Sequence, residues 1–152
     1  MIALNPAVEI AIRLEIGVLF AGALVHKLRA PGEFAGTVEA YLRGTPLRGT
    51  SLGWMAAGLV IAMEAGVVAL SLLPGSAPSA GGAAAAMLSF YAIAMGANIA
   101  RGNVLLDCGC AWAAERQPVS LALVLRNLVL AAIAGLLLLP CLLYTSPSPR
   151  DS

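Results

Sequence analysis

Two cysteines one residue apart, Cys108 and Cys110, are the side chains in this sequence best suited to chemistry. They lie with Asp107 and Gly109 in a short polar stretch between two long apolar segments. A free cysteine has a pKa of about 8.5, and a nearby cation or a helix start favours the reactive thiolate. A disulfide between cysteines this close would form a small strained ring that is readily reduced, and Gly109 tolerates the backbone angles that such a ring needs. The pair is therefore suited to thiol–disulfide exchange rather than to stapling a fold.

Two other interpretations of the cysteine pair stay open. Thiolates bind soft metals such as Cu(I) or Zn, but the only histidine, His26, is remote in sequence and leaves a four-ligand zinc site without partners. In the second of these interpretations the pair has no chemical role, because unpaired cysteines often serve as inert buried apolar residues. Arg101 and Arg116 flank the pair in sequence, and either guanidinium could stabilise a thiolate.

The composition that surrounds this stretch indicates an integral membrane protein. Of the 152 residues, 60% are hydrophobic and 11% are charged, and the mean hydropathy is +0.89. A soluble domain has about 45–50% apolar and about 25% charged residues. We therefore predict one all-α membrane domain over residues 1–140. The net charge of +1 does not point to nucleic acid.

Apolar runs predict four transmembrane helices, because about 20 apolar residues are needed to cross the hydrocarbon core. The runs cover about residues 7–25, 52–73, 80–100 and 119–139. A stretch rich in Pro, Gly and Ser at 74–78 predicts a tight turn that makes the middle two runs an antiparallel hairpin. The first run lacks the basic start and the cleavage site of a secretory signal, so we expect a retained helix. A four-helix bundle would then position the cysteine stretch.

The connection from residue 27 to residue 50 carries a helical pattern of its own. Phe34, Val38, Tyr41 and Leu42 recur at the spacing of one helix face. We predict a short amphipathic helix at the membrane interface, with a solvated loop as the alternative.

Charged residues inside the predicted membrane segments are candidates for function, because they are costly there unless paired or hydrated. Glu64 lies in the middle of the second segment, and Arg126 and Asn127 lie within the fourth. We expect Glu64 to pair with Arg126, or else with Arg13. Such a pair either serves function or only sets the register of the helices.

Residues 141–152 differ abruptly from the Leu-rich segment before them. Their sequence begins CLLYTSPSPRD and resembles one reading frame of a transposase sequencing adapter. We expect this stretch to be read-through rather than a domain, which would leave Cys141 outside the biology.

Several of these residues together resemble the MauE family, methylamine-utilisation membrane proteins grouped with DoxX-like four-helix proteins. The most specific part is Asn98, then Arg101-Gly102, then Cys108-Gly109-Cys110, which follows the pattern N-x-x-R-G-x(4–5)-C-G-C. Ala111-Trp112 departs from the Phe-Gly usual in the family. The remaining matches are weaker one by one: Arg13, Gly17, Phe20, His26-Lys27, Phe34, Val38, Tyr41, Glu64 and Arg126-Asn127.

The resemblance implies a multi-pass protein of the bacterial inner membrane that assists the maturation of periplasmic proteins. It implies a thioredoxin-like redox partner and a periplasmic client, in methylamine users the disulfide-rich small subunit of methylamine dehydrogenase. The resemblance is compatible both with disulfide formation and with electron delivery. One interpretation of the protein is therefore a thiol–disulfide oxidoreductase. The alternatives are a non-catalytic membrane subunit or scaffold, and a copper-handling protein. We assign no cofactor, since quinone-coupled disulfide generators usually carry a C-x-x-C that is absent here.

Cys108 and Cys110 are the residues that we expect to react. Their expected supporting residues are Arg101, Asp107, Gly109, Glu64, Arg126 and Asn127.

Two arguments disagree about the side of the membrane that carries the cysteines. The connections at 27–50 and 101–118 share one face, because two helices separate them. Basic residues in these connections favour the cytoplasm, whereas disulfide chemistry favours the periplasm. We predict the periplasmic side, since an interfacial helix can hold basic residues on either face. The basic residues counted are Lys27, Arg29, Arg43, Arg48, Arg101 and Arg116.

Overall fold

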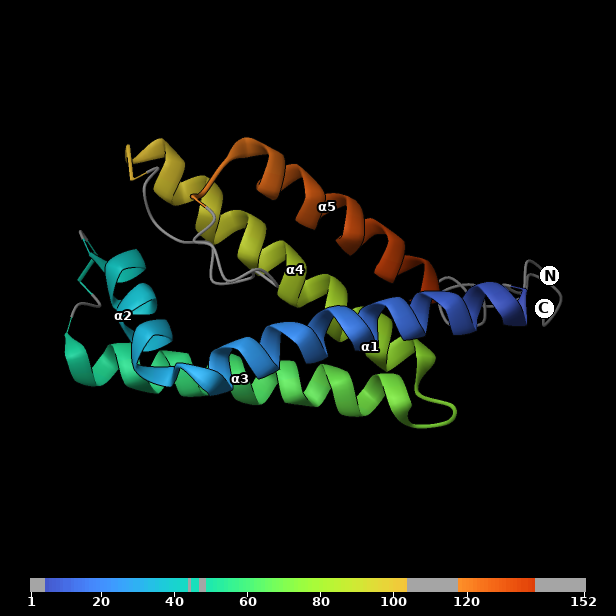
Figure 1. Cartoon of the computed structure of the whole chain (residues 1–152). Coiled ribbons are helices and arrows are strands. Elements are labelled where there is room, and N and C mark those ends of the chain that lie inside the picture. Colours follow the sequence, from blue (N-terminus) through green and yellow to red (C-terminus); the bar gives the residue numbers. More distant parts are fainter. Residues whose placement is uncertain (1–4, 44, 47–48, 104–117, 139–152) are drawn as a thin grey trace, which may run out of the picture.

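The computed structural model describes residues 5–43, 45–46, 49–103 and 118–138. All elements in this part of the chain are helical, which confirms the all-α class. They are α1 (Pro6–Arg29), α2 (Pro31–Leu42), α3 (Thr50–Leu72), α4 (Ala77–Ala100), α5 (Leu121–Gly135) and the short 3-10 helix η1 (Leu136–Leu138) (Figure 1). The four long helices follow the four predicted apolar runs, and α2 is the helix predicted in the first connection.

The long helices pack in two pairs. α1 packs against α3, and α4 packs along α5, while α2 lies on α3 (Figure 1). A glycine permits the closest approach between α4 and the end of α5. A Cβ atom on Gly81 would lie 2.6 Å from the carbonyl oxygen of Ala134 and 2.6 Å from Cβ of Leu137. Any side chain there would therefore force the two helices apart.

The turn between α3 and α4 is shorter than predicted. α4 begins at Ala77, so Pro78 lies inside its first turn, where a proline removes no hydrogen bond that the helix needs. Gly75 takes a positive φ of 75° in the turn. The Ser76 hydroxyl donates to the carbonyl of Leu73 at 2.6 Å.

The end of α4 is built by the Arg101-Gly102 pair that precedes the cysteines in sequence. Gly102 has a φ of 79°, the left-handed conformation that glycine adopts without strain. The Gly102 N–H donates to the carbonyl of Ile99 at 2.9 Å, and the Asn103 N–H donates to that of Asn98 at 2.9 Å. These two bonds form a Schellman motif. The motif residues at 98–102 therefore terminate a helix.

Three helical segments among the described residues are long and apolar enough to cross a membrane. They are Ser51–Leu72, Ala77–Ala100 and Leu121–Leu138. Large apolar side chains such as Ile93 and Leu121 face outward on these helices, as lipid-facing side chains do. The chain therefore fits a membrane protein. α1 is equally long, at 24 residues, but it carries the charged residues Glu9, Arg13, Glu15, Lys27 and Arg29 and does not belong to this set.

One end of the helices gathers α2, the end of α4 and the start of α5 (Figure 1). Met95 of α4 and Val119 are buried there, and Tyr41 of α2 packs against them. The start of α1 and the turn between α3 and α4 lie at the opposite end (Figure 1). The described parts of the two connections, 27–50 and 101–118, therefore lie at the same end of the helices.

Candidate functional site

The buried face of α1 ends on a charged residue. Ile12, Ile16, Phe20 and Ala23 form its apolar stripe, and Lys27 is the next buried position. The spacing of three or four residues keeps all five on one helix face. Lys27 is only 1% exposed. Because the apolar run stops at Val25, Lys27 was predicted to lie in the polar connection, and that prediction was wrong.

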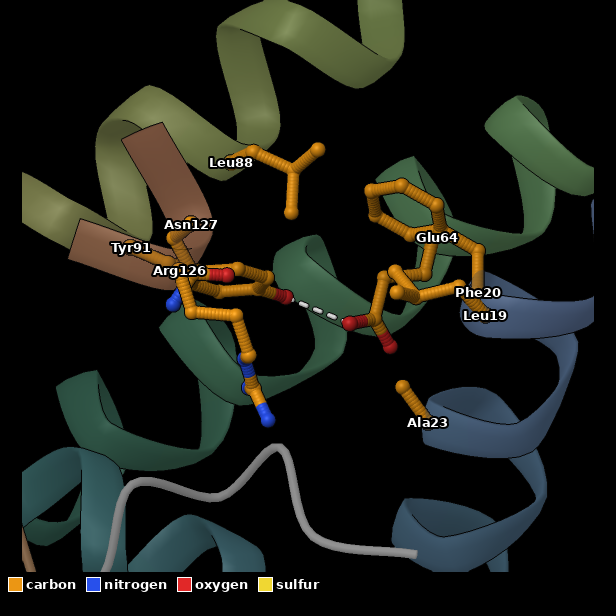
Figure 2. A pocket seen from close by; sticks show the side chains of 8 residues that line it. All are labelled: Leu19, Phe20, Ala23, Glu64, Leu88, Tyr91, Arg126 and Asn127. Atoms are coloured by element: carbon orange, nitrogen blue, oxygen red, sulfur yellow. Dashed lines mark hydrogen bonds between the residues drawn. The ribbon is translucent and has the colours of Figure 1, made fainter. Parts of the chain in front are cut away.

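Glu64 on α3 is the counter-charge of Lys27. Its side chain is 0% exposed, and Lys27 Nζ donates a hydrogen bond of 2.6 Å to Oε1. The Tyr91 hydroxyl on α4 donates to the same oxygen at 2.5 Å, the contact drawn dashed in Figure 2. Three helices therefore meet on one carboxylate oxygen.

Aromatic rings flank the buried ammonium group. Lys27 Nζ lies 5.0 Å from the ring centroid of Phe34 on α2 and 5.6 Å from that of Tyr91. A cation within about 6 Å of an aromatic ring is attracted by the ring quadrupole. The rings and the carboxylate together replace the water that the ammonium group loses on burial. They also tie α2 to the bundle through Phe34.

The pair is neutral as a unit, but its hydrogen bonding is asymmetric. Both donors converge on Oε1 of Glu64. Within the described residues, Oε2 is buried and accepts no hydrogen bond. Buried polar atoms are nearly always hydrogen-bonded, so this oxygen marks a place where a further donor would be stabilised.

A cavity of about 90 Å³ lies beside the carboxylate (Figure 2). One wall is apolar and comes from Leu19, Phe20 and Ala23 of α1 and Leu88 of α4, and the other is polar and comes from Glu64, Tyr91, Arg126 and Asn127. Asn127 is 2% exposed, and its side-chain amide donates to the carbonyl of Leu123 at 2.9 Å. The cavity therefore combines an apolar half with a hydrogen-bonding half.

Both partners expected for Glu64 were wrong. Arg126 lines the cavity, but it is exposed on α5, and its neighbour Asn127 is the buried residue. Arg13 instead donates to backbone carbonyls at the end of α3, to that of Ser71 at 2.9 Å and to that of Leu73. Sequence reasoning weighed only charges inside the predicted segments. Extending the apolar stripe of α1 by four residues would have identified Lys27.

Comparison with known proteins decides the family. The family model described as "Methylamine utilisation protein MauE" matches residues 5–140. The chain belongs to the MauE family.

Curated MauE proteins are similar to this chain over most of its length. The methylamine utilization protein MauE of Paracoccus denitrificans is 40% identical over 133 residues, which are 86% of this chain and 68% of that protein. The protein of that name from Methylorubrum extorquens is 35% identical over 141 residues, which are 90% of this chain and 72% of the relative. No solved structure was found to match the chain. The resemblance to MauE is confirmed, and it connects the chain with methylamine utilisation.

Most of the residues that carried the resemblance to MauE fall into three groups. Those around the buried pair converge from α1, α2, α3 and α5, and they are Phe20, Lys27, Phe34, Glu64, Arg126 and Asn127. Asn98, Arg101 and Gly102 end α4. Cys108, Gly109 and Cys110 lie outside the described residues, as does Asp107, the expected supporting residue beside them. Tyr91 was missed by the sequence analysis, because a tyrosine in an apolar run carries no signal of its own.

Proposed function

We propose that this MauE protein carries out thiol–disulfide exchange through Cys108 and Cys110 at the bacterial inner membrane. The exchange would serve the maturation of periplasmic proteins, by disulfide formation or by electron delivery. The supporting observation is the location of the pair in the chain. It lies between Asn103, where the α4 cap ends, and Pro118, which precedes α5. In the sequence, the two cysteines thus stand in the connection between two apolar helices.

We also propose that α1, α3, α4 and α5 form a four-helix transmembrane bundle, with α2 at the interface. The charges on α1 are compatible with this placement. Lys27 is neutralised by Glu64, and Arg13 is hydrogen-bonded to carbonyls and lies 3.8 Å from Glu9. In α2, Ala35 is buried while Glu33 is exposed, which suits a helix lying along an interface.

We propose that the cysteines face the periplasm. Burial of Lys27 in an ion pair removes one of the basic residues that favoured the cytoplasm, because a paired lysine inside the bundle does not act as an interface charge. A reporter active on only one side of the membrane, inserted near Arg43 and near Arg116, would assign the side. A cytoplasmic result at both positions would refute the periplasmic placement.

The proposed exchange step is a balanced two-electron transfer with a thioredoxin-like partner. A thiolate of the pair attacks the partner's disulfide, and one partner thiolate leaves, which forms a mixed disulfide. The second cysteine then attacks that bond and releases the partner as a dithiol. The pair is oxidised and the partner is reduced by the same two electrons. This sequence delivers electrons to the partner, and the reverse sequence, in which the disulfide of the pair is reduced by a partner dithiol, forms a disulfide in the partner.

Single cysteine variants should trap this intermediate. One of the variants Cys108→Ser and Cys110→Ser keeps the attacking thiol but lacks the resolving thiol, so we expect that variant to accumulate a covalent adduct with its partner. The adduct should appear on non-reducing gels and disappear with dithiothreitol. The double variant is the control and should form none. Absence of an adduct in both single variants would favour a scaffold role. A role in copper handling would be favoured if copper co-purifies with the wild type but not with the double variant.

Arg101 should promote the reactivity of the cysteines. It is the C-cap residue of α4 and is exposed, so its guanidinium is free of the packed core. A nearby cation favours the thiolate, and we therefore expect thiol alkylation in Arg101→Gln to require a higher pH than in the wild type. Arg29→Gln removes an exposed arginine from the end of α1 and should leave the titration unchanged. Superimposable curves for all three proteins would reduce Arg101 to an anchor for the helix end.

A further inference from the structure

We propose that the cavity beside Glu64 binds the hydroxyl group of an uncharged, apolar-tailed molecule from the bilayer, an alkylated phenol or alcohol. This site is separate from the cysteine chemistry and does not depend on it. The proposal rests on an unpartnered buried oxygen, the charges around it and the apolar surface that continues from the cavity.

The polar wall defines the head group. Oε2 of Glu64 accepts no hydrogen bond within the described residues and is buried, so it requires a donor. Arg126 lines the same cavity, and its guanidinium carries only hydrogen-bond donors, so it suits an acceptor. A hydroxyl group is both donor and acceptor.

The charges exclude ionised head groups. Lys27 and Glu64 cancel each other, and Arg126 adds a positive charge to the wall. A cationic head would be repelled by the positive charge of Arg126, which no other described residue of the wall cancels. An anionic head without a proton would have no hydrogen-bond donor for Oε2 of Glu64. A neutral group avoids both costs.

The apolar wall argues against a purely aqueous filling. At about 30 Å³ for each molecule, a cavity of this volume holds roughly three waters, and each needs two to four polar partners. Leu19, Phe20, Ala23 and Leu88 make up half of the lining residues and offer none. A hydroxyl group on a hydrocarbon body satisfies the polar half and the apolar half together.

The cavity adjoins further apolar surface along α1 that would receive the tail. A narrow hollow of about 10 Å³ shares Leu19, Phe20 and Leu88 with it. Leu19 also borders a shallow, open stretch of the outer face of α1, with Leu14, Glu15 and Val18. A tail that leaves the cavity past Leu19 would thus reach the outer surface of α1.

Photolabelling of the protein in lipid nanodiscs tests this inference. The probe is an alkylphenol with a diazirine in its alkyl chain, and its methyl ether is the matched control without a donor. We expect the phenol to label residues around Leu19 and Leu88, as mapped by mass spectrometry, and unlabelled alkylphenol to compete. Labelling by the methyl ether should be at least about tenfold weaker, because it leaves Oε2 unpaired.

A variant that fills the cavity provides the second arm. Ala23 lines the cavity and is buried, whereas Ala11 is exposed on the same helix. Ala23→Leu should remove the specific labelling, and Ala11→Leu should retain it. Equal labelling by phenol and methyl ether in the wild type would overturn the proposal without any variant. Labels scattered over outward-facing side chains, or labels unaffected by Ala23→Leu, would overturn it as well and leave water as the occupant.

Discussion

Replacing Glu64 with glutamine should lower the free energy of unfolding by about 3–5 kcal/mol, the usual effect of removing one member of a buried ion pair. The substitution leaves the Lys27 ammonium group 1% exposed and without its carboxylate. The rings of Phe34 and Tyr91 remain, but they compensate only part of the loss, because a cation–π contact contributes roughly 0.5–2 kcal/mol. Lys27→Met should be destabilising for the same reason, since it isolates the carboxylate instead. Unfolding in mixed micelles, followed by circular dichroism, would measure both.

Two further variants separate the ion pair from general effects of mutation. Glu33→Gln makes the same chemical change at an exposed position of α2 and should change stability by less than about 1 kcal/mol. The charge-swapped double variant Lys27→Glu, Glu64→Lys should recover part of the loss, because it restores a neutral pair. An unchanged unfolding transition in Glu64→Gln would show that the carboxylate is hydrated and unpaired in the membrane.

Loss of either cysteine should abolish maturation of the client protein. A serine hydroxyl cannot form a disulfide or ionise to a thiolate nucleophile, so Cys108→Ser and Cys110→Ser each remove the proposed exchange completely. The readout is the disulfide content of the periplasmic client in a methylamine-using bacterium that lacks its own MauE. The fold should be unaffected, and membrane levels of both variants should match the wild type.

The third cysteine supplies a matched control for this experiment. Cys141→Ser makes the same substitution outside the C-G-C motif and should support full maturation. If Cys108→Ser and Cys110→Ser also support full maturation, the exchange mechanism is refuted and a scaffold role replaces it.

Much of the helical framework could be read directly from the sequence. Segments such as 80–100 are apolar along their whole length, and burial in lipid requires every backbone group to be hydrogen-bonded within the helix. Length and composition therefore determine these elements without reference to their neighbours. The end of α4 was also encoded locally, because Gly102 takes a backbone conformation that glycine favours. The same local character made the Arg-Gly and Cys-Gly-Cys pattern recognisable as that of MauE.

The pairing of the buried charges was decided by the tertiary structure. Glu64 had several basic candidates, and a list of charges does not show which side chains face one another across a bundle. Lys27 was assigned to a polar connection because its sequence neighbours His26 and Arg29 are polar, yet α1 continues through it and turns it inward. Successive residues of a helix are rotated by about 100° around its axis. In α5 this rotation places Asn127 in the buried interior and leaves Arg126 exposed. Composition thus determined which segments are helices, while the rotation and packing of those helices determined which polar groups share the interior.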